Sequence, residues 1–184
     1  MGKTITISGG VGSGKSTVGK MLAKALGWQY YSTGMAQRKI AEEMGITTSE
    51  LNALTIKDKS IDERIDAVFK NPPWGDKNCI VDSRLAFHFI PNSFKVCLTV
   101  ADIIAGERIY GDTSRSGEHK YKNAHEAAVA SAERHQLELS HFQKNYGINI
   151  DDMDNFDLVI DTGNLTPDEV CQKILKAVSE NYPL

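Results

Sequence analysis

The hydrophobic and polar positions of this chain alternate between two periods. Residues 3–8 have the pattern of a β-strand, and after a glycine-rich break the apolar positions Val18, Leu22 and Leu26 recur at helical spacing. Further short runs typical of strands occupy residues 28–31, 78–82, 94–100 and 157–161. Helical patterns occupy residues 102–110, residues 124–146 and the segment that follows Thr166. Strands that alternate with helices predict an α/β fold, with a parallel sheet of about five strands flanked by helices.

The segment 33–70 departs from this alternation and is predicted to be helical. Thr47 with Glu50, and Ser60 with Glu63, have the spacing of capping boxes, in which each side chain of the pair bonds to the backbone of the other residue. The two pairs predict two helix starts inside the segment. We therefore interpret residues 33–70 as a helical insertion in a parallel α/β domain.

Length and composition indicate a single domain in a reducing compartment. The chain has 184 residues and a formal net charge of −3, and its isoelectric point near 6.0 argues against a nucleic-acid partner. Its three cysteines lie far apart without a CxxC pair, so neither a disulfide framework nor a zinc site is indicated. No run approaches the ~20 apolar residues of a membrane span or has the character of a signal peptide. We expect one cytoplasmic domain over residues 1–184, a monomer or weak homodimer that binds no membrane.

The glycine-rich break carries the most specific chemistry. Residues 9–16 fit the pattern G-x-x-x-x-G-K-[ST] and lie between a predicted strand and a predicted helix, where backbone N–H groups and the helix dipole favour bound phosphate. In this pattern Lys15 reaches the β- and γ-phosphates, Ser16 coordinates Mg²⁺ and Thr17 contacts the α-phosphate side. An ordinary glycine-rich turn would not explain Lys15 beside Ser16. The predicted ATP-binding residues are Gly9, Gly10, Val11, Gly12, Ser13, Gly14, Lys15, Ser16 and Thr17.

Asp82 is a candidate for the metal side of the site. It ends the predicted strand 78–82, and ligands of open parallel sheets bind at the carboxyl ends of the strands. Together with the Ser16 hydroxyl it would hold Mg²⁺ as the cofactor of ATP. The alternative for Asp82 is a cap for the following segment 85–89.

Several motifs along nearly the whole chain resemble those of one family. They are residues 7–17, Ser32-Thr33-Gly34 with residues 38–45, Ile61-Asp62, Ile65-Asp66, Ser83-Arg84-Leu85-Ala86, Glu107-Arg108-Ile109, residues 146–149 and residues 157–162. In their order and spacing the chain resembles nucleoside monophosphate kinases, most of all the short, archaeal-type cytidylate kinases and their cytidylate kinase-like relatives. The resemblance implies a central parallel sheet, acceptor binding by the insertion 33–70 and by Ser32, and a mobile lid over residues 111–123. Three positions depart from the family pattern: Asp82-Ser83-Arg84 replaces Glu-Gly-Arg, Asp112 replaces a basic residue, and His141 replaces a second arginine.

Arginines are candidates for the transfer step, because the transition state of phosphoryl transfer spreads charge over oxygens that positioned cations must neutralise. We expect Arg108, Arg115 and Arg134 to act on this state with Lys15; for Arg134 the alternative is a surface ion pair with Glu138, four residues on. The resemblance further implies that Arg38 and Arg84 bind the phosphate of the acceptor, where the guanidinium fork suits the geometry. Their alternative is a solvated surface position.

The acceptor is predicted from two carboxylates. Asp62 and Asp66 stand four residues apart on one face of a predicted helix, at positions that match paired aspartates of the family. A carboxylate accepts from the N4 amino group of cytosine but faces an acceptor, O4, in uracil. We therefore expect an enzyme that phosphorylates CMP or dCMP with Mg·ATP. The alternatives are simple solubility for the two aspartates, a P-loop kinase of another small acceptor (AMP, UMP, a nucleoside or a shikimate-like alcohol), and a nucleotide-binding regulatory module.

Overall fold

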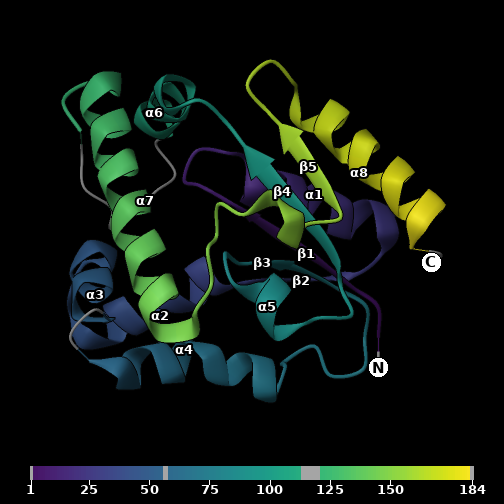
Figure 1. The fold of residues 1–184 in the computed structure, drawn as a ribbon, viewed down its shortest axis with the longest axis horizontal. Coiled ribbons are helices and arrows are strands. Elements are labelled where there is room, and N and C mark those ends of the chain that lie inside the picture. Colours follow the sequence, from purple (N-terminus) through teal and green to yellow (C-terminus); the bar gives the residue numbers. More distant parts are fainter. Residues whose placement is uncertain (1, 56–57, 113–120, 183–184) are drawn as a thin grey trace.

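A computed structural model describes residues 2–55, 58–112 and 121–182. Its centre is one sheet of five parallel strands in the order β2-β3-β1-β4-β5 (Figure 1). The strands are β1 (Thr4–Gly9), β2 (Gln29–Ser32), β3 (Cys79–Asp82), β4 (Phe94–Thr99) and β5 (Leu158–Asp161). The predicted α/β class with a parallel sheet is confirmed, and each strand lies within one or two residues of its prediction.

Eight α-helices and one short 3₁₀ helix are seen among the described residues. They are α1 (Lys15–Leu26), α2 (Thr33–Met44), α3 (Thr48–Thr55), α4 (Lys59–Lys70), α5 (Ala86–Phe89), α6 (Asp102–Gly111), α7 (Ala124–Tyr146), η1 (Met153–Asn155) and α8 (Pro167–Asn181). No helix in the described ranges is long and apolar enough to cross a membrane.

The main core lies between the sheet and the helices α1 and α8. Ile5 and Ile7 of β1 are fully buried and share one apolar cluster with Leu22 of α1 and with Ile174 and Val178 of α8. Parallel strands that are covered by helices are buried along nearly their whole length, as β1 and β3 are, and in β3 this gives the apolar run Cys79 to Val81 before Asp82. This packing fixes the carboxyl ends of β1 and β3, where the polar residues of the site follow.

The helices α2, α3 and α4 have a small core of their own. Ile40, Ala41, Leu51, Ile61 and Ile65 form a separate buried cluster. The Thr47 capping box is confirmed, since the Glu50 N–H donates to Thr47 Oγ1 (3.1 Å) and the Thr47 N–H donates to Glu50 Oε2 (2.7 Å). The segment thus packs by itself at the edge of the sheet domain.

One predicted helix start is wrong. Ser60 does not cap α4, which begins one residue earlier, at Lys59, with Asp58 as its N-cap. The Asp58 carboxylate accepts from the Ser60 N–H at 2.9 Å. Asp and Ser are both good caps, and the residue that has the extended backbone just before the first turn takes the role. The capping pair Ser60–Glu63 therefore does not form, although the helix itself was predicted.

Candidate active site

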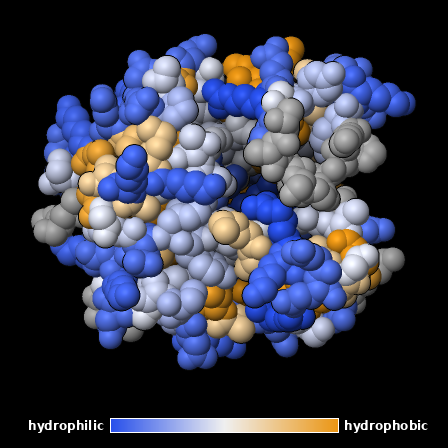
Figure 2. Space-filling view, turned by 180° about the vertical axis from the view of Figure 1, so that it is seen from behind, coloured by the Kyte–Doolittle hydropathy of each residue, from blue (hydrophilic) through white to orange (hydrophobic). Residues whose placement is uncertain are grey.

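A cavity of about 660 Å³ opens beside the carboxyl ends of β1 and β3. Figure 2 shows a hollow on one face of the molecule, where hydrophilic side chains gather. The cavity brings together residues from the start of α1, the ends of β2 and β3, and the helices α2, α4 and α7. The predicted residues that line it are Val11, Gly12, Gly14, Lys15, Ser16, Thr17, Ser32, Arg38, Asp62, Asp66, Asp82, Arg84 and Arg134.

The glycine-rich loop turns sharply between β1 and α1. Gly12 has φ +80°, and a Cβ there would lie 2.8 Å from the Ala105 Cα, so the turn requires glycine. Gly14 is the N-cap of α1 and provides no side-chain acceptor for the first-turn N–H groups. These amides and the helix dipole are therefore available to a phosphate. The Lys15 ammonium lies over the loop and donates to the Gly10 carbonyl at 2.7 Å.

Asp82 lies on the floor of the cavity and collects three hydroxyl groups. Its Oδ2 accepts from Ser16 (2.6 Å), from Tyr30 (2.9 Å) and from Ser32 (3.4 Å). The side chain is 4% exposed. Asp82 is also not the cap of the segment 85–89, because the N-cap of α5 is Leu85 and no side chain caps that helix. The carboxylate and the Ser16 hydroxyl are hard oxygen ligands next to the phosphate loop, which fits Mg²⁺. No group of three or more His, Cys, Asp or Glu in the described ranges could hold a metal, so nucleotide phosphates and water would complete such a site.

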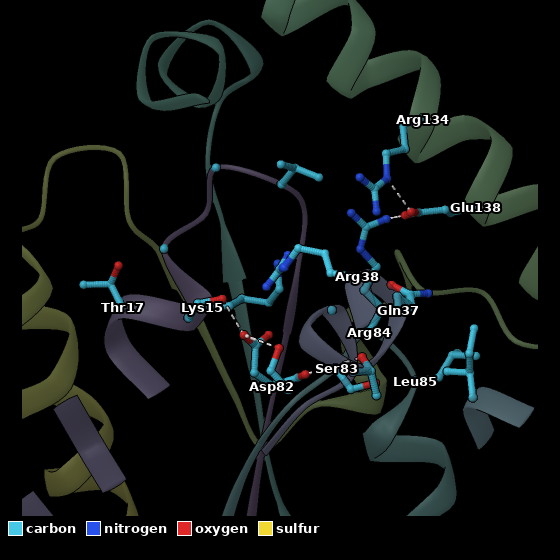
Figure 3. A pocket seen from close by; sticks show the side chains of 18 of the residues that line it. Lys15, Thr17, Gln37, Arg38, Asp82, Ser83, Arg84, Leu85, Arg134 and Glu138 are labelled. Atoms are coloured by element: carbon cyan, nitrogen blue, oxygen red, sulfur yellow. Dashed lines mark hydrogen bonds and ion pairs between the residues drawn. The ribbon is translucent and has the colours of Figure 1, made fainter. Parts of the chain in front are cut away.

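Two arginines share one carboxylate at the wall of the cavity. Arg84 follows β3, Arg134 and Glu138 lie on α7, and both guanidinium groups are turned toward Glu138 (Figure 3). Arg84 contacts Glu138, and Arg134 Nε donates to Glu138 Oε1 at 2.8 Å. Burial, together with the charge of Arg134, lowers the pKa of Arg84 to about 9. Contact with the Glu138 carboxylate favours its charged form.

The other predicted arginines have different surroundings. Arg38 is exposed and lines the cavity from α2. Arg108 donates to the carbonyl oxygens of Gly12 (3.2 Å) and Thr162 (2.7 Å), so its guanidinium joins the phosphate loop to the segment after β5 and does not line the cavity with Lys15. Arg115, and most of the predicted lid 111–123, lie outside the described residues.

Asp62 and Asp66 face the same cavity from α4. Asp62 Oδ2 accepts from His141 Nε2 at 2.8 Å and from Asn145 Nδ2 at 3.3 Å, and Asp66 Oδ2 accepts from the Tyr146 hydroxyl at 2.6 Å. Burial raises the pKa of both carboxyl groups; His141 opposes the rise at Asp62, as the Tyr146 hydrogen bond does at Asp66. The carboxylates are thus held against α7.

The sequence analysis assigned no role to His141, Asn145 or Tyr146. A usable signal was present, because Arg134, Glu138, His141 and Asn145 recur every three or four residues and therefore lie on one face of the long helix. What the sequence did not show is that this face meets α4. Tyr30 was also missed, since a tyrosine in a short strand looks like an ordinary core residue.

The fold and the site together define a P-loop kinase: a parallel sheet, a phosphate-binding turn before α1 with Lys15 and Ser16, and a polar cavity at the ends of the strands. Among solved structures, shikimate kinase from Acinetobacter baumannii in complex with shikimate superposes with a TM-score of 0.63 at 16% sequence identity, over 100% of this chain and 97% of that one. Shikimate kinase from Aquifex aeolicus gives a TM-score of 0.58 at 18% identity, over 98% of each chain. At these identities the likeness concerns the fold alone.

The chain belongs to the cytidylate kinase-like family, whose pattern matches residues 4–164. It is 35% identical to a cytidylate kinase of Methanocella arvoryzae over 176 residues, which is 96% of this chain and 97% of that protein. It is also 38% identical over 173 residues to an S-adenosylmethionine-dependent nucleotide dehydratase of Lacinutrix mariniflava. That match covers 94% of this chain but only 35% of the dehydratase, so the chain spans about a third of the longer relative.

Proposed function

We propose that this chain transfers the γ-phosphoryl group of ATP, in the presence of Mg²⁺, to the phosphate of CMP or dCMP. The observation that carries the choice of acceptor is the pair Asp62 and Asp66 on the wall of the cavity. The names of the two relatives, a cytidylate kinase and a nucleotide dehydratase, support a nucleotide as the ligand.

The donor end binds by main chain and by one cation. The N–H groups at the start of α1 and the Lys15 ammonium hold the β- and γ-phosphates, and Ser16 with Asp82 would hold the metal ion. When bound, Mg²⁺ neutralises charge on the phosphate oxygens. Phosphoryl transfer requires little covalent chemistry from the protein, so this positioning is most of the catalysis.

The arginines serve the space between donor and acceptor. Arg38 and Arg84 bind the acceptor phosphate, and Arg134 stabilises the charge that develops during transfer. Two guanidinium groups repel each other, and Glu138 offsets that repulsion by contacting both. The two cations attract a phosphate dianion that enters beside them. Its oxygens accept hydrogen bonds from the arginine N–H groups that the Glu138 carboxylate does not pair.

The acceptor base is read by α4. One oxygen of each aspartate is occupied by α7, and the other oxygen, Oδ1, accepts no hydrogen bond from the described residues. The exocyclic amine of cytosine supplies N–H donors for these oxygens, whereas O4 of uracil would face them with a second acceptor. The apolar side chains Ile65 and Phe142 line the same part of the cavity and suit the faces of a base. A site built to receive a donor rejects the analogue that lacks it, because buried acceptors stay unpaired.

The test is kcat/KM for CMP, dCMP, UMP and AMP with wild type, Asp62→Asn and Asp66→Asn. We expect a preference for CMP over UMP of about 100-fold, and a loss of at least about 10-fold in that ratio in each variant, since an amide can turn its own donor toward the base. Glu63→Gln, an exposed position on the same helix, is the matched control. Equal efficiency with CMP and UMP in the wild type contradicts the proposal, and a higher value for AMP reassigns the acceptor. Excess EDTA should abolish transfer, and full activity in EDTA contradicts the role of Mg²⁺.

A further inference from the structure

Two neighbouring tyrosines of β2 point to opposite faces of the sheet, as successive strand residues do. The Tyr30 hydroxyl donates to Asp82 Oδ2 at 2.9 Å. The Tyr31 ring packs on Trp74 instead, with ring centroids 5.3 Å apart, and its hydroxyl has no hydrogen bond within the described ranges. The same residue type thus occupies two different environments, of which one touches the predicted metal site.

A glycine on α1 makes room for the Tyr30 ring. A Cβ at Gly19 would lie 2.8 Å from Tyr30 Cε2, closer than real Cβ contacts. Gly19 is buried inside the helix, where glycine is unfavourable relative to alanine by about 1 kcal/mol. The contact gives a physical reason for a residue that weakens the helix: without a side chain there, the ring reaches from β2 to the end of β3.

Of the three residues whose hydroxyl groups donate to Asp82 Oδ2, Tyr30 is the one that does not line the cavity. Ser16 is the residue that would coordinate Mg²⁺, and Ser32 is farther from Asp82 Oδ2, at 3.4 Å. A tyrosine hydroxyl is protonated at neutral pH and therefore acts as the donor to the Asp82 carboxylate. Outer-shell donors of this kind orient the carboxylates that face a metal, and their loss lowers metal affinity or activity.

We propose that Tyr30 is a positioning residue of the metal site: its hydroxyl fixes the rotation of the Asp82 carboxylate, and Gly19 permits the ring to be there. This inference rests on the proposed requirement for Mg²⁺. Tyr30 touches neither nucleotide nor metal in this role, so it acts only through Asp82.

The experiment compares Tyr30→Phe with Tyr31→Phe, which removes the hydroxyl from the neighbouring tyrosine on the other face. Binding of ADP is measured by calorimetry as a function of Mg²⁺ and again in EDTA, next to the thermal midpoint and the Mg²⁺ concentration for half-maximal activity. In Tyr30→Phe we expect the half-saturating Mg²⁺ concentration to rise on the order of 10-fold, with metal-free ADP affinity within about twofold of wild type, as Lys15 and the loop amides are unchanged. Tyr31→Phe should match wild type in both.

An unchanged Mg²⁺ dependence in Tyr30→Phe would overturn the inference. An equal loss of ADP affinity with and without Mg²⁺ would overturn it too, because it would indicate that Tyr30 serves only general packing. Gly19→Ala tests the same contact from α1 and should raise the half-saturating Mg²⁺ concentration without removing any hydroxyl. Wild type that binds ADP equally well and transfers phosphate in EDTA contradicts the Mg²⁺ requirement of the proposed function, whatever Tyr30→Phe does. The two failures are therefore distinguishable.

Discussion

The two ends of the cavity are built in different ways. At the proposed donor end, residues 9–17 form one continuous loop and helix start, and the groups that we propose to bind phosphate are mostly main-chain amides. At the acceptor end, α4 meets α7 through side chains that are 79 and 80 positions apart in the chain, as in His141–Asp62 and Tyr146–Asp66. Main-chain amides can bind any triphosphate of the right length, whereas side chains such as Asp62 and Asp66 are expected to distinguish one base from another. If the proposed function holds, phosphate binding and base specificity depend on separate parts of this molecule, and a single substitution should impair one without the other.

The largest effect is expected at the donor end. Lys15→Ala should lower kcat/KM by ~10³-fold or more for every acceptor alike, because the variant lacks the cation that neutralises the transferred phosphoryl group. Lys24→Ala, an exposed lysine on the same helix, is the control. Steady-state kinetics with circular dichroism decide the matter. A folded Lys15→Ala enzyme that keeps turnover within tenfold of wild type would rule out the role of this lysine.

The next effect concerns the arginines between the two ends. Arg134→Ala should lower kcat on the order of 10²-fold with little change in KM for either substrate, because the guanidinium acts on the transition state. The Arg84–Glu138 contact remains, so the fold should persist. The control is Glu133→Ala at an exposed position on the same helix. If kcat is unchanged, the pair of Arg134 with Glu138 at 2.8 Å is only a structural ion pair.

A smaller effect is expected at the acceptor end. His141→Leu removes one donor from Asp62 and leaves Asn145 in place, so the preference for CMP over UMP should fall by about 3- to 10-fold. KM for ATP should be unchanged, because the proposed ATP site with Lys15 lies at the other end of the cavity. The control is His135→Leu. His135 is also on α7, and it pairs with Asp151, beyond the end of the helix, at 2.9 Å. Equal changes in both histidine variants would show that α7 responds to general packing.

The smallest effect is a difference in pH dependence between two aspartates of the same helical region. Burial raises the pKa of Asp66, so the folded state holds its proton to higher pH than the unfolded state, and the free energy of unfolding falls as pH rises above the ordinary value of 3.8. Hydrogen bonds from Ser60 lower the pKa of Asp58, so its contribution is lost as pH falls below 3.8. Urea unfolding of the free protein between about pH 3 and pH 7 is the measurement.

Asp66→Asn should remove the first of these trends and Asp58→Asn the second. Relative to wild type, the Asp66 variant gains stability as pH rises, and the Asp58 variant loses stability as pH rises from about 3. Parallel curves for wild type and Asp66→Asn would show that burial does not bias the protonation of this carboxyl group.

The sequence was sufficient to predict the parts of the site that are formed by residues adjacent in the chain. The phosphate loop could be predicted because its glycines, Lys15 and Ser16 are adjacent and because the backbone conformation of a strand–turn–helix unit places them. The central strands β3 and β4 could be predicted because buried parallel strands tend to be short apolar runs, and the alternation of strands with helices predicted the parallel sheet. Asp82 followed from its place at the end of such a strand.

The contacts of Arg108 and of the polar face of α7 depend on long-range packing and could not be predicted. Arg108 was predicted at the transition state from its motif, but in this structure it donates to carbonyl oxygens of the loop and of the segment after β5. The face of α7 that carries Glu138 and His141 could be recognised from its spacing, yet not its partner, because helical periodicity says which residues are on one side and not what that side meets.

What the sequence by itself determined is the parallel α/β fold and the phosphate-binding end of the cavity, since both follow from short-range periodicity and from backbone geometry. What only the tertiary structure decided is which side chains from distant segments contact one another: Tyr30 with Asp82, Arg84 with Glu138, and α7 with the aspartates of α4. The physical reason is that these contacts extend over angstroms in space but over tens of positions in the chain. They depend on how the separate apolar clusters of the sheet and of α2 to α4 set the helices against one another.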